Sequence, residues 1–545
     1  MLLSIRHQFS LALQNAFFKV TLNRFSTAFF VLSFVYCFAQ GITQAFLFSV
    51  DTRWRTFTSE VVGHANINTT VFLQYTLHYT WEICNDTPVS GVAGACVPFY
   101  NWHQANATTI PPFFRRDDEG FGSLTQSSTY AVQPLDDARW IIEDGTPSRL
   151  VVSSATNENG TFVVVSQHDT SNSITLDPVC TRTMLYPDQK LDQYSREDAS
   201  LIAAHFWLFG LALFALVYES IPHLIALAFA RLLATAWSAY AIWRTINLGQ
   251  RLDRLVGPGT PCHLNIFPAY FAERVRFQIA DLVLHATALL LVLVLSWRLA
   301  RTYQNATFAR ACPPAHILKI YRYFLAVFVC LQLAVFFLVV AMSLWIDQLV
   351  NGAIADLSWH TGVYEALFIS TTVFLLPWIA TGWFSIRREN ARLTLAFLVT
   401  AFIFIAAWAL MFYSQVYRFT FVDWPFFGSI TLTAFVVMVL SMVFALLCRS
   451  NFDRGLAHFL YVEKALADSD FEPEVFARDP EKAALPYGAG PAGWERAERD
   501  SPLSVTPEKR IELTLSLASD ELSDDEDDLK GSKTNILSRL DFEKR

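Results

Sequence analysis

Two ionisable residues four positions apart, Asp281 and His285, lie within an apolar segment of the chain. Residues four apart share one face of an α-helix, so this carboxylate and this imidazole can act together on a proton or a cation. Ionisable side chains are costly inside a membrane, and where they occur there they mark candidate functional positions. Three more residues in apolar segments are candidates for this reason: His205, Arg231 and Glu365.

Asp356, His360 and Glu365 gather at the start of another apolar segment. Together with the first pair they are candidates for a polar lumenal pocket or a metal site, although Asp and His at this depth are more often solvated or structural. Arg231 is the deepest charge, and we expect its side chain to extend toward the membrane surface.

Motifs of known enzymes are missing from the sequence. The chain has no H-E-x-x-H, no phosphate loop of the G-x-x-x-x-G-K-[ST] type, no G-x-S-x-G and no C-x-x-C. We therefore expect a protein that is not an enzyme, with no catalytic residues, no metal ligands and no cofactor.

The composition indicates a membrane protein. Of the 545 residues, 53% are hydrophobic and 17% are charged, and the mean hydropathy is +0.32. Soluble globular proteins carry about a quarter charged residues, so this chain is too apolar for that class. The lipid bilayer is its first expected partner, and nucleic acid is not one.

Membrane spans of about 20 apolar residues can be placed along the chain. The least secure division is at Glu219, Pro222 and His223, which interrupt an apolar run long enough for two spans joined by a tight turn. With that division, eight spans are expected: 26–48, 200–218, 222–243, 277–298, 322–346, 361–384, 393–414 and 426–447.

Lys and Arg accumulate on the cytosolic side of membrane proteins, and their distribution fits eight spans with both termini cytosolic. The supporting residues are Arg6, Lys19, Arg24, Arg298, Arg301, Arg310, Lys319, Arg387, Arg388, Arg392 and Arg449. One expected lumenal loop, 244–276, disagrees with this rule. It contains Arg244, Arg251, Arg254, Arg274 and Arg276.

Residues 49–199 follow the first span and are expected on the lumenal or extracellular side. Four N-x-[ST] sequons support that side: Asn68, Asn85, Asn106 and Asn159. β-Branched and aromatic runs bounded by turns predict strands within 70–83, 139–144, 148–154 and 160–167. We expect a glycosylated, β-rich domain with a core of its own, followed by a seven-helix bundle at 200–447.

The cysteines fit an oxidising compartment on that side of the membrane. Cys84 and Cys96 bracket a short loop and are expected to form a disulfide. Cys180 has no partner left in the same domain, so Cys262 in the next large loop is its candidate partner. Spacing alone does not fix this connectivity.

The two ends of the chain are expected in the cytosol. Residues 1–25 have apolar residues near one helical face and predict an amphipathic segment. Residues 448–545 hold 14 Lys and Arg against 22 Asp and Glu, so the whole net charge of -8 lies there. We expect this tail to be mostly disordered and to bind a cytosolic adaptor or a kinase. Its candidate phosphorylation sites are Ser501, Thr506, Ser519 and Ser523.

A first span, a glycosylated lumenal domain, seven more spans and a cytosolic tail form a layout that resembles the Wntless and Golgi-dynamics-domain seven-helix proteins. That resemblance implies escort or sensing of cargo in the secretory pathway, and it assigns no residue a role. The stretches "SLWIDQLVNGAIADLS" and "WALMFYSQVYRFTFVDWPFFGSI" are similar in texture to uncharacterised fungal multi-pass proteins, which implies a membrane location.

The expected fold is therefore an α-helical polytopic membrane protein of about eight transmembrane helices, with a β-rich extracytoplasmic domain after the first. Two functions remain open. The first is a non-enzymatic receptor, sensor or cargo-binding protein with a lumenal or extracellular ligand. The second is a transporter or lipid-handling protein that uses its buried ionisable residues. The expected location is the plasma membrane or an endomembrane of the secretory pathway.

Overall fold

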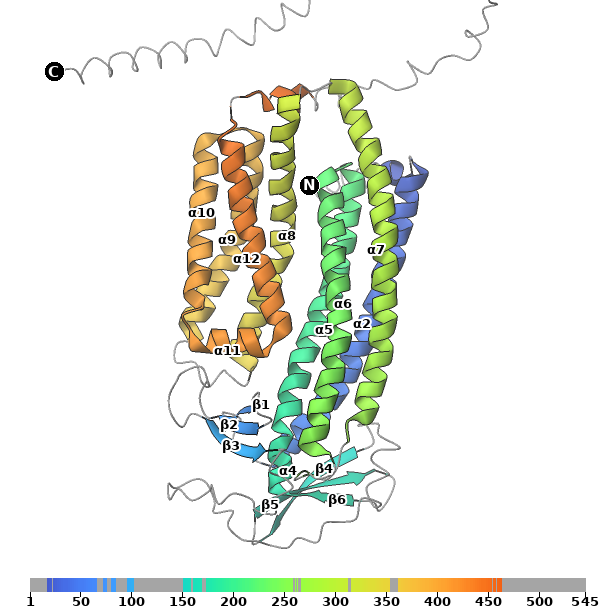
Figure 1. Ribbon diagram of the computed structural model, residues 1–545, viewed down its shortest axis with the longest axis vertical. Coiled ribbons are helices and arrows are strands. Elements are labelled where there is room, and N and C mark those ends of the chain that lie inside the picture. The colour runs from blue at the N-terminus through green and yellow to red at the C-terminus, as the bar shows by residue number, and fades with distance from the viewer. Residues whose placement is uncertain are drawn as a thin grey trace, which may run out of the picture. The chain divides into compact units, whose positions relative to one another are not determined.

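The computed structural model of the protein is built mainly from long α-helices, with small antiparallel sheets at one end (Figure 1). The residues described are 17–21, 23–65, 72–75, 80–84, 96–101, 150–157, 160–168, 173–257, 260, 262, 266–311, 315–352, 361–452, 454–456 and 458–462. Within these ranges, eight helices are long and apolar enough to cross a membrane, which is the number expected from the sequence.

The eight long helices are α2 Arg24–His64, α5 Leu185–Val217, α6 Ile221–Val256, α7 Pro268–Ala311, α8 Ala315–Asn351, α9 Thr361–Arg387, α10 Ala391–Met411 and α12 Pro425–Arg449. The first five of them extend well past the spans expected from hydropathy, whereas α9, α10 and α12 end within three residues of theirs. At a rise of 1.5 Å per residue, the 41 residues of α2 measure roughly 60 Å, about twice the thickness of a hydrocarbon core. The longest helices therefore project beyond the bilayer. Two short helices, α4 Pro178–Thr183 and α11 Gln415–Asp423, complete the set.

Local sequence signals explain where several helices begin and end. The side chain of Asn23 caps α2 by accepting a hydrogen bond from the backbone of Phe25 at 3.1 Å. Between α5 and α6, Glu219 has a left-handed backbone with φ 48°, and the amide of Ser220 donates to the carbonyl of Ala215 at 3.0 Å. This turn confirms that the long apolar run divides into two helices.

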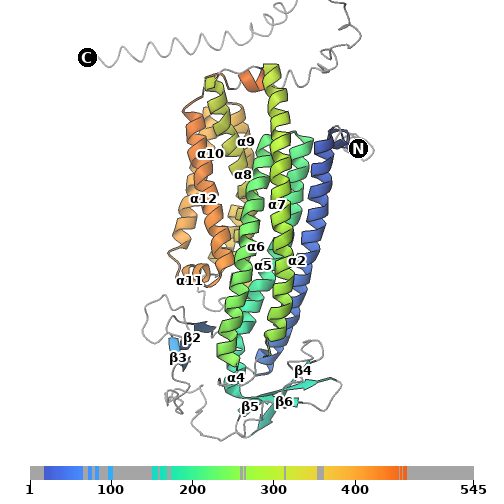
Figure 2. The ribbon, with the colours of Figure 1, turned by 45° about the vertical axis from the view of Figure 1, so that its right-hand side comes forward.

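The helices form two groups of four, which Figures 1 and 2 show side by side. In the first bundle, α2 packs against α5 and α7, and α6 packs against α5 and α7. In the second bundle, α8 packs along α12, while α9 and α10 complete the group. Contacts between α6 and α8 join the two bundles. The second bundle has an apolar, aromatic core in which Trp378 stacks on Phe397 with ring centroids 5.0 Å apart.

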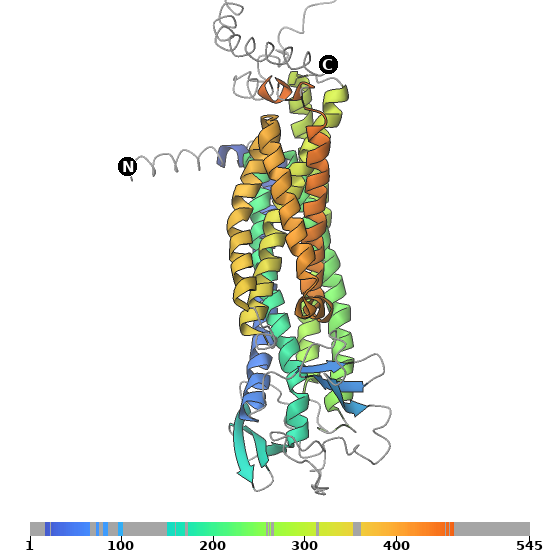
Figure 3. The same ribbon diagram turned by 90° about the vertical axis from the view of Figure 1, so that its left-hand side faces the viewer.

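The described strands form two three-stranded antiparallel sheets. One contains β1 Phe72–Tyr75, β2 Thr80–Cys84 and β3 Cys96–Asn101, and the other contains β4 Leu150–Asn157, β5 Gly160–Gln167 and β6 Ser173–Leu176. Both lie at the end of the molecule where α2 finishes (Figure 3). We call this the strand end. The strand expected at 139–144 lies outside the described residues.

The described strands do not have a core of their own, contrary to expectation. Val163 of β5 and Trp81 of β2 belong to one buried apolar cluster with Trp54 of α2 and Leu252 of α6. The rings of Trp81 and Tyr186 of α5 lie 4.7 Å apart. Range 49–199 is also helical at both ends, because α2 continues to His64 and α5 begins at Leu185. The sheets therefore extend the first bundle.

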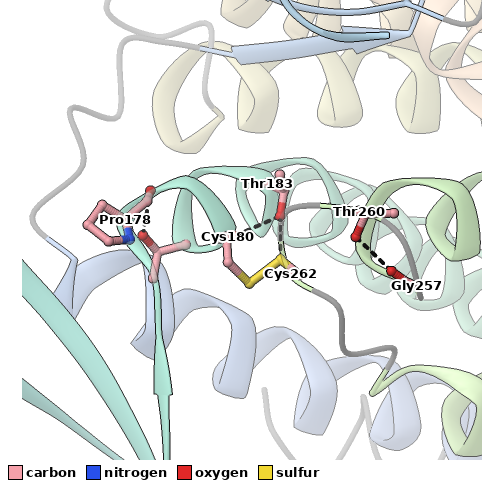
Figure 4. Close-up of a disulfide and its surroundings, with 7 residues drawn as sticks. Pro178, Cys180, Thr183, Gly257, Thr260 and Cys262 are labelled. Carbon is pink, nitrogen blue, oxygen red and sulfur yellow. Dashed lines mark hydrogen bonds between the residues drawn. A yellow bond between two sulfur atoms is a disulfide. The ribbon is translucent and has the colours of Figure 1, made fainter. Parts of the chain in front are cut away.

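Two disulfides stabilise the strand end, and both join the pairs expected from the sequence. Cys84–Cys96 connects directly opposed residues of β2 and β3. Cys180–Cys262 joins α4 to the segment between α6 and α7 (Figure 4). The hydroxyl of Thr183 donates to the carbonyl of Cys180 at 2.6 Å and lies 3.0 Å from Sγ of Cys262. Among the described cysteines, Cys37, Cys330 and Cys448 are free and buried.

Candidate functional site

The helices of the first bundle turn polar residues inward along regular stripes. On α7, Tyr270, Arg274, Gln278, Asp281 and His285 follow one another at intervals of three or four residues, and all five are buried. Such spacing places side chains on a single helical face. The other three helices direct buried polar residues toward the same interior: Gln40, Gln44 and Asp51 of α2, Glu197, Asp198 and His205 of α5, and Arg231, Ser238, Arg244 and Thr245 of α6.

At the centre of these stripes is a group that we call the His–Asp cluster, formed by His205 of α5 with Asp281 and His285 of α7. Each of the three offers a donor atom, and these atoms all lie within 4.8 Å of one another. Nε2 of His285 is 3.6 Å from Oδ1 of Asp281, and the two imidazole rings are 5.4 Å apart between centroids. All three side chains lie in expected membrane spans, so water does not solvate them freely.

Several polar atoms of the His–Asp cluster have no hydrogen-bond partner among the described residues. They are both ring nitrogens of His205, Nδ1 of His285 and Oδ1 of Asp281. The other carboxylate oxygen of Asp281 accepts a hydrogen bond from the hydroxyl of Ser238 on α6 at 2.8 Å. Buried polar atoms normally have partners, because leaving one unpaired costs about 1–3 kcal/mol. The cluster therefore has unused capacity to bind a proton or a cation.

Arg231 is the nearest positive charge to this cluster. Its side chain is 1% exposed, and Nη1 donates a hydrogen bond to Oε1 of Gln40 on α2. The guanidinium interacts electrostatically with His205, His285 and Asp281. The expectation that Arg231 extends to the membrane surface is therefore wrong, because the amide of Gln40 holds it inside the bundle.

A second group, which we call the ion-pair cluster, lies closer to the strand end. Arg274 of α7 forms a fully buried ion pair with Asp51 of α2, and its other terminal nitrogen lies 3.8 Å from Oδ1 of Asp198 on α5. The hydroxyl of Tyr270 donates to Asp51 at 2.9 Å. The amide of Gln44 donates to Asp198 at 2.7 Å. Three helices are thus cross-linked around a single guanidinium.

Glu197 and Arg244 make the second charge pair of the ion-pair cluster. Nη2 of Arg244 donates to Glu197 at 2.6 Å, and the indole of Trp237 donates to the same carboxylate at 2.8 Å. The guanidinium of Arg244 also lies over the ring of Tyr194, 4.5 Å from its centroid, which is a cation–π contact. Trp237 and Arg244 belong to α6, so all four helices of the first bundle take part.

The two clusters form one continuous row of buried polar groups. Arg274 and Asp281 are seven residues apart on α7, which is a rise of about 10 Å, and Asp198 interacts electrostatically with Asp281. Toward the other end of the bundle the buried residues are mainly apolar, with Phe29 of α2 and Val292 and Leu299 of α7, and the buried polar groups there are hydroxyls such as those of Ser33 and Ser296. Among the described residues, the buried charged groups therefore lead from the strand end to the His–Asp cluster and Arg231 and do not continue beyond them.

Sequence reasoning missed most of the ion-pair cluster. It placed Arg244 and Arg274 in a loop at 244–276, whereas α6 continues to Val256 and α7 begins at Pro268. Two of the five arginines that disagreed with the charge rule, Arg244 and Arg274, are buried and paired with Glu197 and Asp51, so they are not free positive charges on one side of the membrane. The repeat of polar residues on α7 was the signal that could have revealed them.

Other predicted site residues are not brought together by the described structure. Glu365 lies in α9, and His360 and Asp356 fall outside the described residues. The same holds for the sequons Asn68, Asn85, Asn106 and Asn159, and for Ser501, Thr506, Ser519 and Ser523 of the tail. These assignments stay predictions.

Glu82, Cys84 and Cys96 form another group that could hold a metal ion by the spacing of their donor atoms. The two cysteines form a disulfide, so their sulfurs are not free to bind a metal.

Two apolar cavities lie away from the polar row. One is in the second bundle beside Phe404 and Trp408, and the other lies between Phe57 of α2 and Val165 of β5. Neither cavity is lined by a residue of the polar row.

Ion pairs at the strand end also tie the first bundle to the second. Nζ of Lys190 on α5 lies 2.8 Å from both carboxylate oxygens of Asp423 at the end of α11, and Gln193 donates to one of them at 3.1 Å. Burial alone would raise the pKa of Asp423, but the Lys190 ammonium and these hydrogen bonds outweigh it and hold that pKa below its usual value. Asp423 is therefore ionised at neutral pH.

The chain matches no protein-family model, and it has no significant similarity to a curated protein or to a solved structure.

Proposed function

We propose that this multi-pass membrane protein transports a cation, and that the cation crosses the first bundle through the His–Asp cluster. The observation that carries the proposal is the unpaired donor capacity of His205, Asp281 and His285 within membrane-spanning helices. Ionisable residues at such depth are typical of ion pathways and proton relays. Of the two functions left open by the sequence, this one belongs to the transporter class.

The ion-pair cluster supports a route to the His–Asp cluster from the strand end. Its carboxylates, Asp51 and Asp198, share the single guanidinium of Arg274, so two acidic groups face one positive charge and a cation can be attracted to the site. A cation arriving at Asp198 can exchange with the guanidinium as its counter-ion. Gln44 and Ser238 then provide hydrogen-bonding groups beside Asp198 and Asp281.

The apolar residues beyond the cluster support a transporter closed on one side. Phe29, Val292 and Leu299 separate the His–Asp cluster from the end at which α2 begins. Alternating access requires a barrier on only one side of a central site at a time. The proposed cycle therefore includes a shift of α2 or α7 that opens this barrier.

Flux measurements in proteoliposomes test the proposal. Purified full-length protein would be reconstituted with an entrapped pH indicator or an entrapped fluorescent chelator, and an outward or inward cation gradient would be imposed. We expect cation uptake to depend on the protein, and to fall at least about tenfold in Asp281→Asn, because the variant keeps the size of the side chain but loses its charge.

Glu273→Gln is a matched control for that variant. Glu273 is a carboxylate on the same helix, but it is 43% exposed and pairs with the exposed Arg53 at 3.4 Å. Its neutralisation should leave the flux unchanged. Equal losses in Asp281→Asn and Glu273→Gln, or no flux above that of empty vesicles for any cation tested, would contradict the proposal.

A sensor role is the second candidate, and one observation favours it. The sheets share their apolar core with the ends of α2, α5 and α6, through residues such as Trp81 and Val163. A ligand that moved the sheets would therefore shift these helix ends. If the protein is a sensor, a substitution at the strand end such as Tyr186→Ala should change its output, whereas Asp281→Asn should not.

A further inference from the structure

We infer that His205, Asp281 and His285 form a binding site for a divalent transition-metal ion of the zinc class. Their donor atoms lie within 4.8 Å of one another inside the bundle, and four of their polar atoms have no partner among the described residues. Two imidazoles and one carboxylate are a donor set that zinc accepts readily. Harder cations such as Mg²⁺ and Ca²⁺ prefer sites made of oxygen alone.

The spacing of the donors suits tetrahedral coordination after a small contraction. Zinc binds imidazole nitrogen and carboxylate oxygen at about 2.0–2.2 Å, which places neighbouring ligand atoms roughly 3.4 Å apart. Nε2 of His285 and Oδ1 of Asp281 are already 3.6 Å apart. The donor atom of His205, on the facing helix α5, lies within 4.8 Å of both. Three protein ligands leave a fourth position open for water or for a transferring group.

Ser238 supplies the outer support that such a site needs. Its hydroxyl binds Oδ2 of Asp281, which turns the other oxygen of that carboxylate toward His285. Hydrogen bonds of this kind orient metal-binding carboxylates, and their loss typically lowers metal affinity by about 10–100-fold. Ser238 is therefore a positioning residue in the inferred site.

Arg231 opposes the metal and thereby limits its affinity. Its guanidinium interacts with all three members of the cluster, and a positive charge there repels a divalent cation. The hydrogen bond to Gln40 holds the guanidinium on the side of α2. A site that binds a metal ion with limited affinity is able to release it again, as transport requires.

The inference makes two claims. That the metal ion is transported rests on the proposed function, since zinc is then the cation that moves. That the metal ion binds does not depend on the proposed function. Two separate measurements distinguish the claims. Metal binding to the purified protein tests the site, and flux into vesicles tests transport. If the protein bound zinc but moved no cation, the inferred metal site would stand and the proposed transport function would be rejected.

Equilibrium binding of Zn²⁺ and Co²⁺ to the full-length protein in detergent decides the inference. We expect one Zn²⁺ per chain, displaced by a chelator, and a Co²⁺ absorption in the visible range as strong as that of four-coordinate sites. His205→Gln and His285→Gln should each weaken Zn²⁺ binding by more than about 100-fold, and Ser238→Ala by about 10–100-fold. Arg231→Gln should strengthen it.

His223→Gln is the matched control, because His223 is a partly buried histidine of α6 that bonds to Ser220 at 2.8 Å, outside the cluster. Thermal unfolding without metal identifies any variant that fails to fold. Zn²⁺ should raise the midpoint of the wild type and of His223→Gln, but not of His285→Gln. Binding that is absent, or that all variants retain at full strength, or that His223→Gln alone removes, would overturn the inferred site.

Discussion

The Asp51–Arg274 pair is the most deeply buried charge pair described in the protein, with 0% and 1% of the two side chains exposed. Burying two charges costs several kcal/mol for each, and their attraction recovers that cost only with good geometry and further hydrogen bonds. Tyr270 and Asp198 supply these bonds and contacts. Neutralising one residue of the pair should therefore destabilise the protein more than replacing both residues with apolar ones.

We expect Asp51→Asn to destabilise the protein by about 3–5 kcal/mol, because it leaves the Arg274 guanidinium buried without its main counter-ion. The double variant Asp51→Leu with Arg274→Met should recover part of that loss, since it removes both charges of the pair, although Asp198 then loses its contact with the guanidinium and keeps the hydrogen bond from Gln44. Thermal or denaturant unfolding in detergent measures the difference. Glu273→Gln, in the exposed pair with Arg53, should change stability by less than about 1 kcal/mol. A double variant less stable than Asp51→Asn would contradict this account.

Two pairs of residues show which parts of the candidate site could be predicted from the sequence and which could not. Asp281 and His285 were recognisable because both lie on one helix, four positions apart in an apolar segment. Asp51 and Arg274 were not, because they are more than 200 residues apart and each lies just beyond the window in which hydropathy defines a span. Pairing across helices depends on tertiary packing, which a single sequence does not specify.

At the scale of elements, the closest approach of α9 to α10 depends on a glycine. A Cβ added at Gly382 would lie 2.6 Å from Cε2 of Phe397, a ring that is fully buried against Trp378. Small residues at helix contacts allow such approach inside membranes. The ring cannot easily move, because it is fully buried and stacks on Trp378.

Gly382→Ala should therefore destabilise the protein by about 1–3 kcal/mol, through the displacement of Phe397. Gly210→Ala in α5 provides the control, because nothing lies within 4 Å of an added Cβ there. That change should be neutral or stabilising by up to about 1 kcal/mol, since alanine favours a helix more than glycine does. The unfolding midpoints of the two variants are measured in the same detergent. Equal shifts would show that the contact between position 382 and Phe397 does not determine the loss of stability.

The elements that the sequence predicted best are those set by local patterns. All eight long helices contain an expected span, because about 20 consecutive apolar residues specify a helix whatever surrounds it. The antiparallel pair of β4 and β5 follows from β-branched and aromatic runs bounded by turn residues. The helical extensions beyond the membrane are not apolar enough to be recognised, and the shared core of sheets and helix ends depends on contacts across the chain.

At the scale of the whole molecule, the charged residues that are buried in the described part of the chain all lie in the first bundle. The first bundle holds the ion-pair cluster and the His–Asp cluster, while the second bundle is closed by apolar and aromatic packing around residues such as Trp345 and Phe427. This division suggests that the second bundle acts as a scaffold against which α2 and α7 can shift. The Lys190–Asp423 pair would then hold α5 in place during that shift.

Sidedness is the property of the whole molecule that most affects the proposed route, because it fixes the compartment from which a cation enters. The start of α2 and the end of α12 lie at the same end of the helices, opposite the sheets (Figure 1). If both termini are cytosolic, as the sequence predicts, the strand end is lumenal and the polar row leads toward the lumen. The sequons Asn68, Asn85, Asn106 and Asn159 should then carry glycans, whereas Asn305, near the far end of α7, should carry none.

Glycosidase treatment of the protein made in eukaryotic cells tests this orientation. We expect a gel-mobility shift that becomes smaller as each of the four asparagines is changed to Gln, and no change of that shift with Asn305→Gln. The reason is that the transferase acts only on the lumenal side, so glycans mark the strand end directly. A glycan on Asn305 together with none on the four sequons would invert the molecule and would make the polar row open to the cytosol instead.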